Sequence, residues 1–339
     1  MIDIDFYMKT HSLKKSVMAG GKPQNVQKSL DWLRSKEPIV FNIETTNACN
    51  MTCHFCPRTT LMTRPVKTMD TAVFMKIALQ LKPHPDTLWA EWVEFAEKAY
   101  NVPRYEQSED AFFLYILTRV LVLHGYGDPL LDPHMADYVG ILTRAGVPSY
   151  FSCNPMNIHL GKVANCFENG LTYIKYSIDS LKSSARGKDA FKADYPKIMQ
   201  VLEMKAKKNF KTKVIITMIN LGQDEFGALQ EAFKGTDVYI YQKSLDQTWM
   251  VGGQKPKSIH WSEPCQIPWS SMTINSGGYA VMCEEDYDGE VILGDAKVQS
   301  LNDIWNGDIY TELRKAHFAG NADKCWNRCD MIPYGKWLK

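Results

Sequence analysis

Six short apolar segments alternate with longer amphipathic ones between residues 38 and 243, and this alternation limits the chain to few folds. The apolar segments are PIVFNIET (38–45), RVLVLHG (119–125), VPSYFSC (147–153), LTYIKYSI (171–178), KTKVIITMI (211–219) and DVYIYQK (237–243). Helical patterns separate them over 70–81, 133–146, 160–170, 189–209 and 224–235. Right-handed β-α crossovers then predict an α/β fold with a six-stranded parallel sheet, either open or curled into part of a barrel. In such folds the chemistry lies at the carboxyl ends of the strands.

Two regions interrupt this alternation. Residues 81–118 are rich in Trp, Phe and Tyr and form either a lid or partner surface or, as we favour, an aromatic stripe of the core. From about residue 252 the pattern predicts a hairpin turning at Ser276-Gly277-Gly278 and then one amphipathic helix over 300–320. In the first 35 residues the pattern predicts only a short helix that ends near Trp32. The expected domains are an N-terminal extension (1–37), a barrel (38–250) and a small C-terminal domain (251–339).

The charge balance argues against several kinds of partner. The chain has 39 Lys and Arg against 38 Asp and Glu, with both signs scattered, so no basic stripe is available for nucleic acid or an anionic membrane. The N-terminus lacks the apolar core of a signal peptide, and no segment runs to about 18 apolar residues. We therefore expect a soluble, cytoplasmic protein without nucleic-acid or membrane partners.

Three of the nine cysteines, Cys49, Cys53 and Cys56, follow the first predicted strand closely. An odd, unevenly spread set of cysteines in a large intracellular chain indicates metal or redox chemistry rather than a disulfide framework. A structural zinc site needs four ligands, and recruiting His54 beside Cys53 would strain so tight a loop. A four-iron cluster takes one thiolate per iron, so three cysteines leave one iron open to an outside ligand.

The Cys-x3-Cys-x2-Cys spacing, with Phe55 before the last cysteine, resembles that of radical S-adenosylmethionine (SAM) enzymes. The resemblance implies a partial (β/α)6 barrel, a [4Fe-4S] cluster that binds SAM at its open iron, and cleavage of SAM to a 5′-deoxyadenosyl radical that abstracts a substrate hydrogen. HGYGDPLLDP (124–133) is similar to the glycine-rich SAM motif of the family, with Asp128 where Glu is usual, and SIDS (177–180) closes the fourth strand as in the family. The residues that the resemblance assigns to SAM are Phe55, Gly125, Tyr126, Gly127, Asp128, Ser177, Asp179 and Arg186.

Taken without the resemblance, these positions also have ordinary interpretations. Gly125 and Gly127 are typical of turns, and Ser177 and Asp179 are typical of helix caps. Arg186 is typical of a solvated loop. The cysteine triplet is the one motif that is specific by itself.

Four further cysteines, Cys265, Cys283, Cys325 and Cys329, lie near the C-terminus. Four thiols close a metal site completely, so either zinc or a fully ligated cluster fits them. Their arrangement around GGYAVMC and CWNRC resembles the SPASM domain and the shortened twitch domain of radical SAM enzymes. The resemblance implies one auxiliary [4Fe-4S] cluster that transfers electrons.

An electron-accepting cluster favours a reaction in which the substrate is oxidised. Our first hypothesis is an oxidoreductase that dehydrogenates a small polar substrate such as a sugar or aminocyclitol alcohol, because about 35 residues before the first strand are too few for a peptide-recognition domain. The alternatives are a peptide maturase that oxidises, crosslinks or epimerises, and a non-catalytic electron-transfer protein. The implied reductant is a protein such as flavodoxin or ferredoxin.

Some of the chemistry stays open at this stage. Cys153 is either a hydrogen donor for epimerisation or, as we favour, a small buried side chain, and Cys166 is a core residue. The candidates for the base are Tyr126, Asp179, Lys243 and Glu284, which the sequence does not rank.

Overall fold

The computed structural model describes residues 1–18, 29–53, 56–178, 183–184, 187–188, 190–219, 223–243 and 265–318. It contains the six predicted strands, which are β1 (Val40–Ile43), β2 (Leu121–Val122), β3 (Ser149–Cys153), β4 (Tyr173–Ile178), β7 (Lys213–Ile219) and β8 (Val238–Lys243). Each pairs in parallel with the next one along the chain. A sheet whose strand order follows the chain, without reversal, is that of a curled barrel and not of an open doubly wound sheet. The predicted fold class is confirmed.

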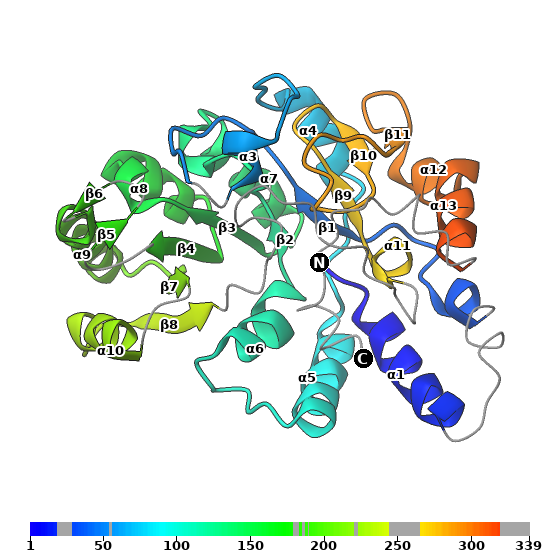
Figure 1. Cartoon of the computed structure of the whole chain (residues 1–339), viewed down its shortest axis with the longest axis horizontal. Helices are drawn as coiled ribbons and strands as arrows, with labels where there is room; N and C mark the ends of the chain where they lie inside the picture. Colours follow the sequence, from blue (N-terminus) through cyan, green and yellow to red (C-terminus); the bar gives the residue numbers. More distant parts are fainter. Residues whose placement is uncertain are drawn as a thin grey trace.

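The crossover helices cover the outer face of this curled sheet. They are α4 (Thr71–Ala78), α7 (Met135–Arg144), α8 (Leu160–Glu168), α9 (Ala190–Lys208) and α10 (Gln223–Ala232). The Asp70 side chain caps α4 by accepting the Ala72 N–H at 2.7 Å. Alternate residues of β4, Ile174 and Tyr176, belong to the large core between strands and helices. Figure 1 shows β4, β7 and β8 bending round at the left of the sheet.

The aromatic insertion builds a second core and part of a third. It forms α5 (Asp86–Tyr100), α6 (Glu109–Phe112) and a π-helical turn, η1 (Phe113–Leu117). Trp89 and Trp92 pack with α1 (Ile4–Met18), as the core interpretation predicted. Phe112, in contrast, joins strand side chains in the interior of the barrel. The insertion therefore supplies both core and barrel lining.

The C-terminal segment extends the same sheet. It contains α11 (Ile267–Ser270), β9 (Met272–Ile274), β10 (Tyr279–Val281), β11 (Ile292–Asp295), α12 (Leu301–Asn306) and α13 (Asp308–Phe318). Strands β9 and β10 form the predicted antiparallel hairpin, and β9 lies parallel to β1. The result is one nine-stranded sheet in the order β11-β10-β9-β1-β2-β3-β4-β7-β8.

One helix prediction was wrong, and one helix was not predicted. The segment 300–320 is not one helix, because Gly307 between α12 and α13 has extended backbone (φ −70°, ψ 167°). The buried Arg314 donates to the Trp305 carbonyl at 3.0 Å, a group that this break leaves without a helical partner. The N-terminal extension is helical over residues 29–33, as the predicted short helix near Trp32 requires. It also carries the 15-residue α1, which the sequence did not predict and which packs against the insertion.

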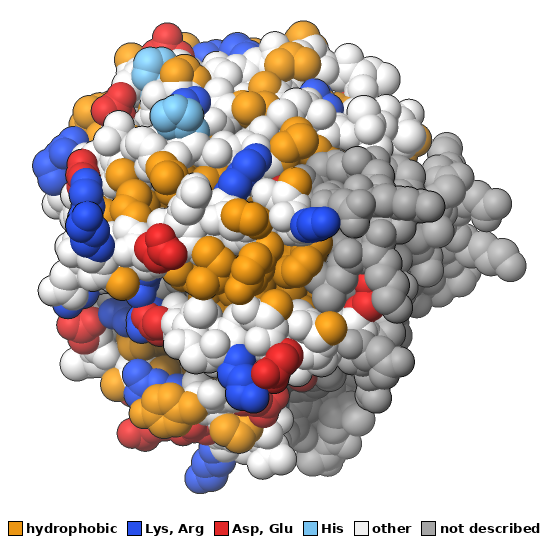
Figure 2. Space-filling model, turned by 90° about the vertical axis from the view of Figure 1, so that its left-hand side faces the viewer, with side chains coloured by type: hydrophobic (Ala, Val, Ile, Leu, Met, Phe, Trp, Pro, Cys, Tyr) orange, Lys and Arg blue, Asp and Glu red, His pale blue; other side chains and the backbone are white. Residues whose placement is uncertain are grey.

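The remaining described elements are short, and none of the described helices has the length and apolar character that a membrane crossing requires. The short elements are α3 (Pro57–Thr60), η2 (Pro129–Leu131), η3 (Pro155–Asn157), β5 (Ser183–Ser184) and β6 (Gly187–Lys188). Figure 2 shows one face of the molecule, where Lys and Arg alternate with Asp and Glu around apolar side chains near its centre. The described side chains of this face form no continuous basic stripe.

Candidate functional site

The cysteine triplet lies on the loop that follows β1, at the carboxyl edge of the sheet. Cys49, Cys53 and Cys56 are partly exposed, and none forms a disulfide. The Cys56 N–H donates to the Cys53 carbonyl at 3.1 Å, which turns the chain between these two thiols. Asn47 anchors the start of the loop, since its carbonyl accepts from Arg58 Nε at 2.9 Å.

The donor chemistry of this loop fits an iron–sulfur cluster. Burial raises the pKa of Cys49 and of Cys56, and the nearby Cys49 adds to the rise at Cys56. Both are therefore thiols at neutral pH and would have to lose their protons to bind iron. Among the described residues, no three His, Cys, Asp or Glu side chains gather as the ligands of a single ion do.

The glycine-rich loop after β2 lies directly against the segment that leads to the cysteines. A Cβ on Gly127 would stand 2.1 Å from the Thr46 carbonyl oxygen, so only glycine fits there. The next N–H, of Asp128, donates to the Ala48 carbonyl at 2.8 Å. The two motifs that the sequence assigned to SAM and its cluster therefore meet through backbone contacts.

Asp128, which stands where the family has Glu, has its carboxylate occupied by protein groups. It accepts from the N–H of Leu130 and of Asn154, both at 2.9 Å, and from Asn157 Nδ2 at 2.8 Å. Asn157 in turn accepts from Asn50 Nδ2 of the cysteine loop at 2.7 Å. Burial raises the pKa of Asp128, although these donors favour its charged form. Its side chain holds the loops after β2 and β3 to the cysteine loop.

The sequence did not identify Glu44, which joins three segments at this edge. The buried carboxylate forms a two-pronged ion pair with Arg64 at 2.6 and 2.7 Å. It also accepts the N–H of Tyr126 at 3.1 Å and of Ser276 at 3.0 Å. Burial opposes ionisation of Glu44, but Arg64 and the two N–H groups outweigh it and keep the pKa below its usual value.

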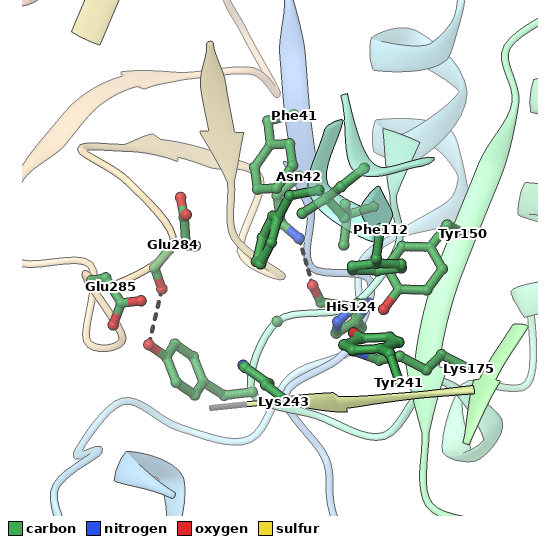
Figure 3. Close-up of a pocket in the computed structure, with 15 residues that line it drawn as sticks. Phe41, Asn42, Phe112, His124, Tyr150, Lys175, Tyr241, Lys243, Glu284 and Glu285 are labelled. Carbon is green, nitrogen blue, oxygen red and sulfur yellow. Dashed lines mark hydrogen bonds between the residues drawn. The ribbon is translucent and has the colours of Figure 1, made fainter. Parts of the chain in front are cut away.

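A cavity of about 210 Å³ opens beside these loops, in the interior of the barrel. Figure 3 shows Phe112, Tyr150, Tyr241 and Lys175 on one side of it, with Glu284 and Glu285 on the other. The lining thus combines strand side chains, the inserted segment and the loop that follows β10. Tyr126 of the glycine-rich loop connects the sides, since its hydroxyl donates to the Glu284 carbonyl at 2.9 Å.

His124 lines this cavity, and its ring is neutral. Burial, together with Lys175 and Lys243, lowers the pKa of His124 to about 3. Its Nδ1 accepts the Ser152 N–H at 3.1 Å, so the ring proton is on Nε2.

The structure brings some of the predicted residues together and separates others. Gly125, Tyr126, Lys243 and Glu284 line the cavity. The Ser177 hydroxyl lies 3.0 Å from that of Ser152 at the ends of β4 and β3. Phe55, Asp179, Arg186, Cys325 and Cys329 lie outside the described residues.

Cys153 and Cys166 both belong to the core between sheet and helices, and neither lines the described cavity. Burial raises the pKa of both thiols, to about 12 for Cys166. Of the C-terminal cysteines that the structure describes, Cys265 is partly exposed and Cys283 is buried.

The C-terminal segment matches a known domain. Residues 265–330 match SPASM, an iron-sulfur cluster-binding domain, and this range contains all four C-terminal cysteines. With the chain-ordered parallel sheet and the two loops at its carboxyl edge, this match defines the class. The chain is a radical SAM enzyme with a C-terminal SPASM-type domain.

One known protein and two solved structures are similar to this chain. The S-adenosyl-L-methionine-dependent 2-deoxy-scyllo-inosamine dehydrogenase of Niallia circulans is 20% identical over 302 residues, covering 86% of this chain and 93% of that protein. The crystal structure of BtrN in complex with AdoMet and 2-DOIA shares the fold with a TM-score of 0.51 at 17% identity, over 86% of this chain and 92% of that one. SuiB of Streptococcus suis bound to precursor peptide SuiA has a TM-score of 0.49 at 12% identity, over 86% and 71%. The predicted cofactors, SAM, its [4Fe-4S] cluster and an auxiliary cluster, are those of this class.

Proposed function

We propose that this enzyme dehydrogenates a small polar alcohol of the sugar or aminocyclitol kind. The observation that carries the proposal is the cavity between the glycine-rich loop and the C-terminal domain. Its volume of about 210 Å³ is below the roughly 300–1,000 Å³ that is common for drug-sized ligands, which favours a small substrate. Its cations, carboxylates and aromatic rings suit a ring that carries hydroxyl and amino groups. The dehydrogenase relative from Niallia circulans supports the same class of substrate.

In this proposal Cys49, Cys53 and Cys56 hold the cluster whose open iron binds SAM. The glycine-rich loop, Phe55, Ser177, Asp179 and Arg186 bind SAM, and the four C-terminal cysteines hold the closed auxiliary cluster. When bound, these groups supply a hydrogen-abstracting radical and an electron acceptor. The protein then has to orient the alcohol, exclude water and accept the hydroxyl proton. A protein such as flavodoxin or ferredoxin delivers the first electron.

The test is anaerobic turnover of the reconstituted enzyme with SAM, dithionite and 2-deoxy-scyllo-inosamine. We expect 5′-deoxyadenosine together with a carbonyl product that is two hydrogens lighter than the substrate. Turnover without loss of hydrogen, but with solvent deuterium in the product, would contradict dehydrogenation in favour of epimerisation. No 5′-deoxyadenosine from protein with both clusters would leave only the electron-transfer role.

Metal content tests the ligand assignment separately. We expect about eight irons per chain, as two four-iron clusters require, and about four after Cys49, Cys53 and Cys56 are changed to Ala. The matched control is Cys166→Ala in the core, which should keep all of the iron. Zinc at the C-terminal site would remove the electron acceptor from the proposal.

A further inference from the structure

Lys175 lies in the middle of β4 and points into the barrel. Its neighbours Ile174 and Tyr176 face the helices, so by strand alternation Lys175 faces the interior, where it lines the cavity. The residue is 8% exposed, and Nζ lies 3.4 Å from the Tyr241 hydroxyl. None of the ion pairs between described residues involves Lys175. Keeping a buried lysine charged without a carboxylate partner costs free energy. A lysine at such a position is therefore a candidate functional residue.

Three aromatic rings surround the amine. Nζ lies 5.1 Å from the ring centre of Phe112, 5.8 Å from that of Tyr150 and 6.0 Å from that of Tyr241. Ring faces attract an ammonium ion most strongly where water is excluded. Burial therefore disfavours the charged form of Lys175, whereas the three rings favour it. These opposed effects suit a lysine that gains and loses a proton.

The charges around Lys175 act in opposite directions. Burial and the neighbouring Lys243 lower the pKa of Lys175 to about 7, whereas Glu109 of α6 and Cys153 of β3 act to raise it. A lysine near neutrality is matched to general-base catalysis at physiological pH. Lys243 and His124 line the same cavity, and Figure 3 shows the side chains of Glu284 and Glu285 across it.

Two other groups in contact with this region are poor proton acceptors. His124 has its Nδ1 occupied by the Ser152 N–H and a pKa of about 3. Burial raises the pKa of the Tyr241 hydroxyl well above its usual value, so this group stays protonated. Neither is matched to accept a proton near pH 7.

We propose that Lys175 is the catalytic base that accepts the hydroxyl proton of the substrate during dehydrogenation. The assignment rests on the proposed function. The carbon-bound hydrogen atom goes to the 5′-deoxyadenosyl radical and forms its new C–H bond. The O–H bond breaks, its proton goes to Nζ, and the remaining electron goes to an oxidised iron–sulfur cluster while the C=O bond forms. The ammonium ion then rests among the three rings until it releases the proton.

The first test measures the ionisation of Lys175 without turnover. The reconstituted enzyme is labelled with acetic anhydride from pH 5 to 10, and peptide mass spectrometry reports the extent at each lysine. We expect Lys175 to become reactive with a midpoint near pH 7, and labelling of the exposed Lys211 is followed as the surface control. Labelling of Lys175 only above about pH 9, or none at any pH, overturns the assignment, because the base must be neutral and reachable from the cavity.

The second test uses 2-deoxy-scyllo-inosamine, deuterated at the reacting carbon, as the probe. In Lys175→Arg, which stays charged, we expect carbonyl formation to fall at least about 100-fold, while deuterium still enters 5′-deoxyadenosine. Lys175→Ala should regain part of the rate when methylamine is added, and the wild-type rate should fall as the pH drops below about 7. Iron content shows that each variant is folded.

The two hypotheses fail in different ways. Carbonyl formation at the wild-type rate in Lys175→Arg and Lys175→Ala overturns the role of Lys175 and leaves the dehydrogenase intact. No carbonyl product from wild-type enzyme overturns the proposed substrate class, and the labelling midpoint then decides the ionisation of Lys175 by itself.

Discussion

The two walls of the cavity are built in different ways. The barrel wall consists of side chains such as Lys175 and Tyr241, which regular strands present at alternate positions. The opposite wall, where β1 meets the glycine-rich loop and the C-terminal hairpin, depends on the buried carboxylate of Glu44 and on backbone N–H groups. A regular sheet tolerates the loss of one side chain, whereas a junction made by one carboxylate does not.

The strongest test of this contrast is Glu44→Ala. The change leaves Arg64 largely buried without its partner and removes the acceptor of two N–H groups, so we expect a loss of about 3–5 kcal/mol. Anaerobic urea unfolding and hydrogen exchange at Tyr126 and Ser276 measure it. The control is Glu37→Gln, whose ion pair with Lys82 is exposed and whose loss should change stability by less than about 0.5 kcal/mol.

The second test is Gly127→Ala, at the contact between the two loops. The new Cβ would meet the Thr46 carbonyl at 2.1 Å, and because that atom is backbone the loops must separate, at about 1–3 kcal/mol. SAM affinity, measured by equilibrium dialysis, should fall as well. Gly227→Ala in α10 is the matched control, since a Cβ there meets nothing within 4 Å, and the change should stabilise the helix by about 0.5–1 kcal/mol.

The third test addresses the barrel wall through Lys175→Met. The native state lowers the pKa of Lys175 to about 7, whereas the unfolded chain holds that proton to about pH 10.4. Between these values the unfolded state binds more protons, so the wild type gains stability as the pH rises from 7 to 9, by roughly 2 kcal/mol. Urea unfolding at the two pH values should show this gain in the wild type and in Lys211→Met, but not in Lys175→Met.

The smallest expected effect is that of Tyr126→Phe, which removes one hydrogen bond between the glycine-rich loop and the C-terminal segment. Loss of the contact with the Glu284 carbonyl should cost about 1 kcal/mol in urea unfolding. Tyr105→Phe, at a side chain that is 88% exposed, should cost nothing measurable. An equal effect in both variants would show that the Tyr126 hydroxyl does not join the glycine-rich loop to the C-terminal segment.

The barrel could be predicted from the sequence because alternating short apolar and amphipathic segments are a local signal, and each strand appeared where such a segment stood. Lys175 was missed although it interrupts the apolar run LTYIKYSI, since a sequence does not reveal which face of a strand looks inward. Glu44 was missed for a different reason. Its partner Ser276 is 232 positions away, and no local pattern carries that contact.

The pairing of β9 with β1 also has a consequence for how the chain is made. Strand β1 is synthesised long before its partner β9, since Val40 pairs with Met272. Contacts of such large sequence separation form late and slowly. The strands from β2 to β8 pair with their neighbours in order of synthesis, so we expect the barrel to assemble first and the C-terminal hairpin to complete it. Until β9 pairs with it, β1 therefore lies at an open edge of the sheet.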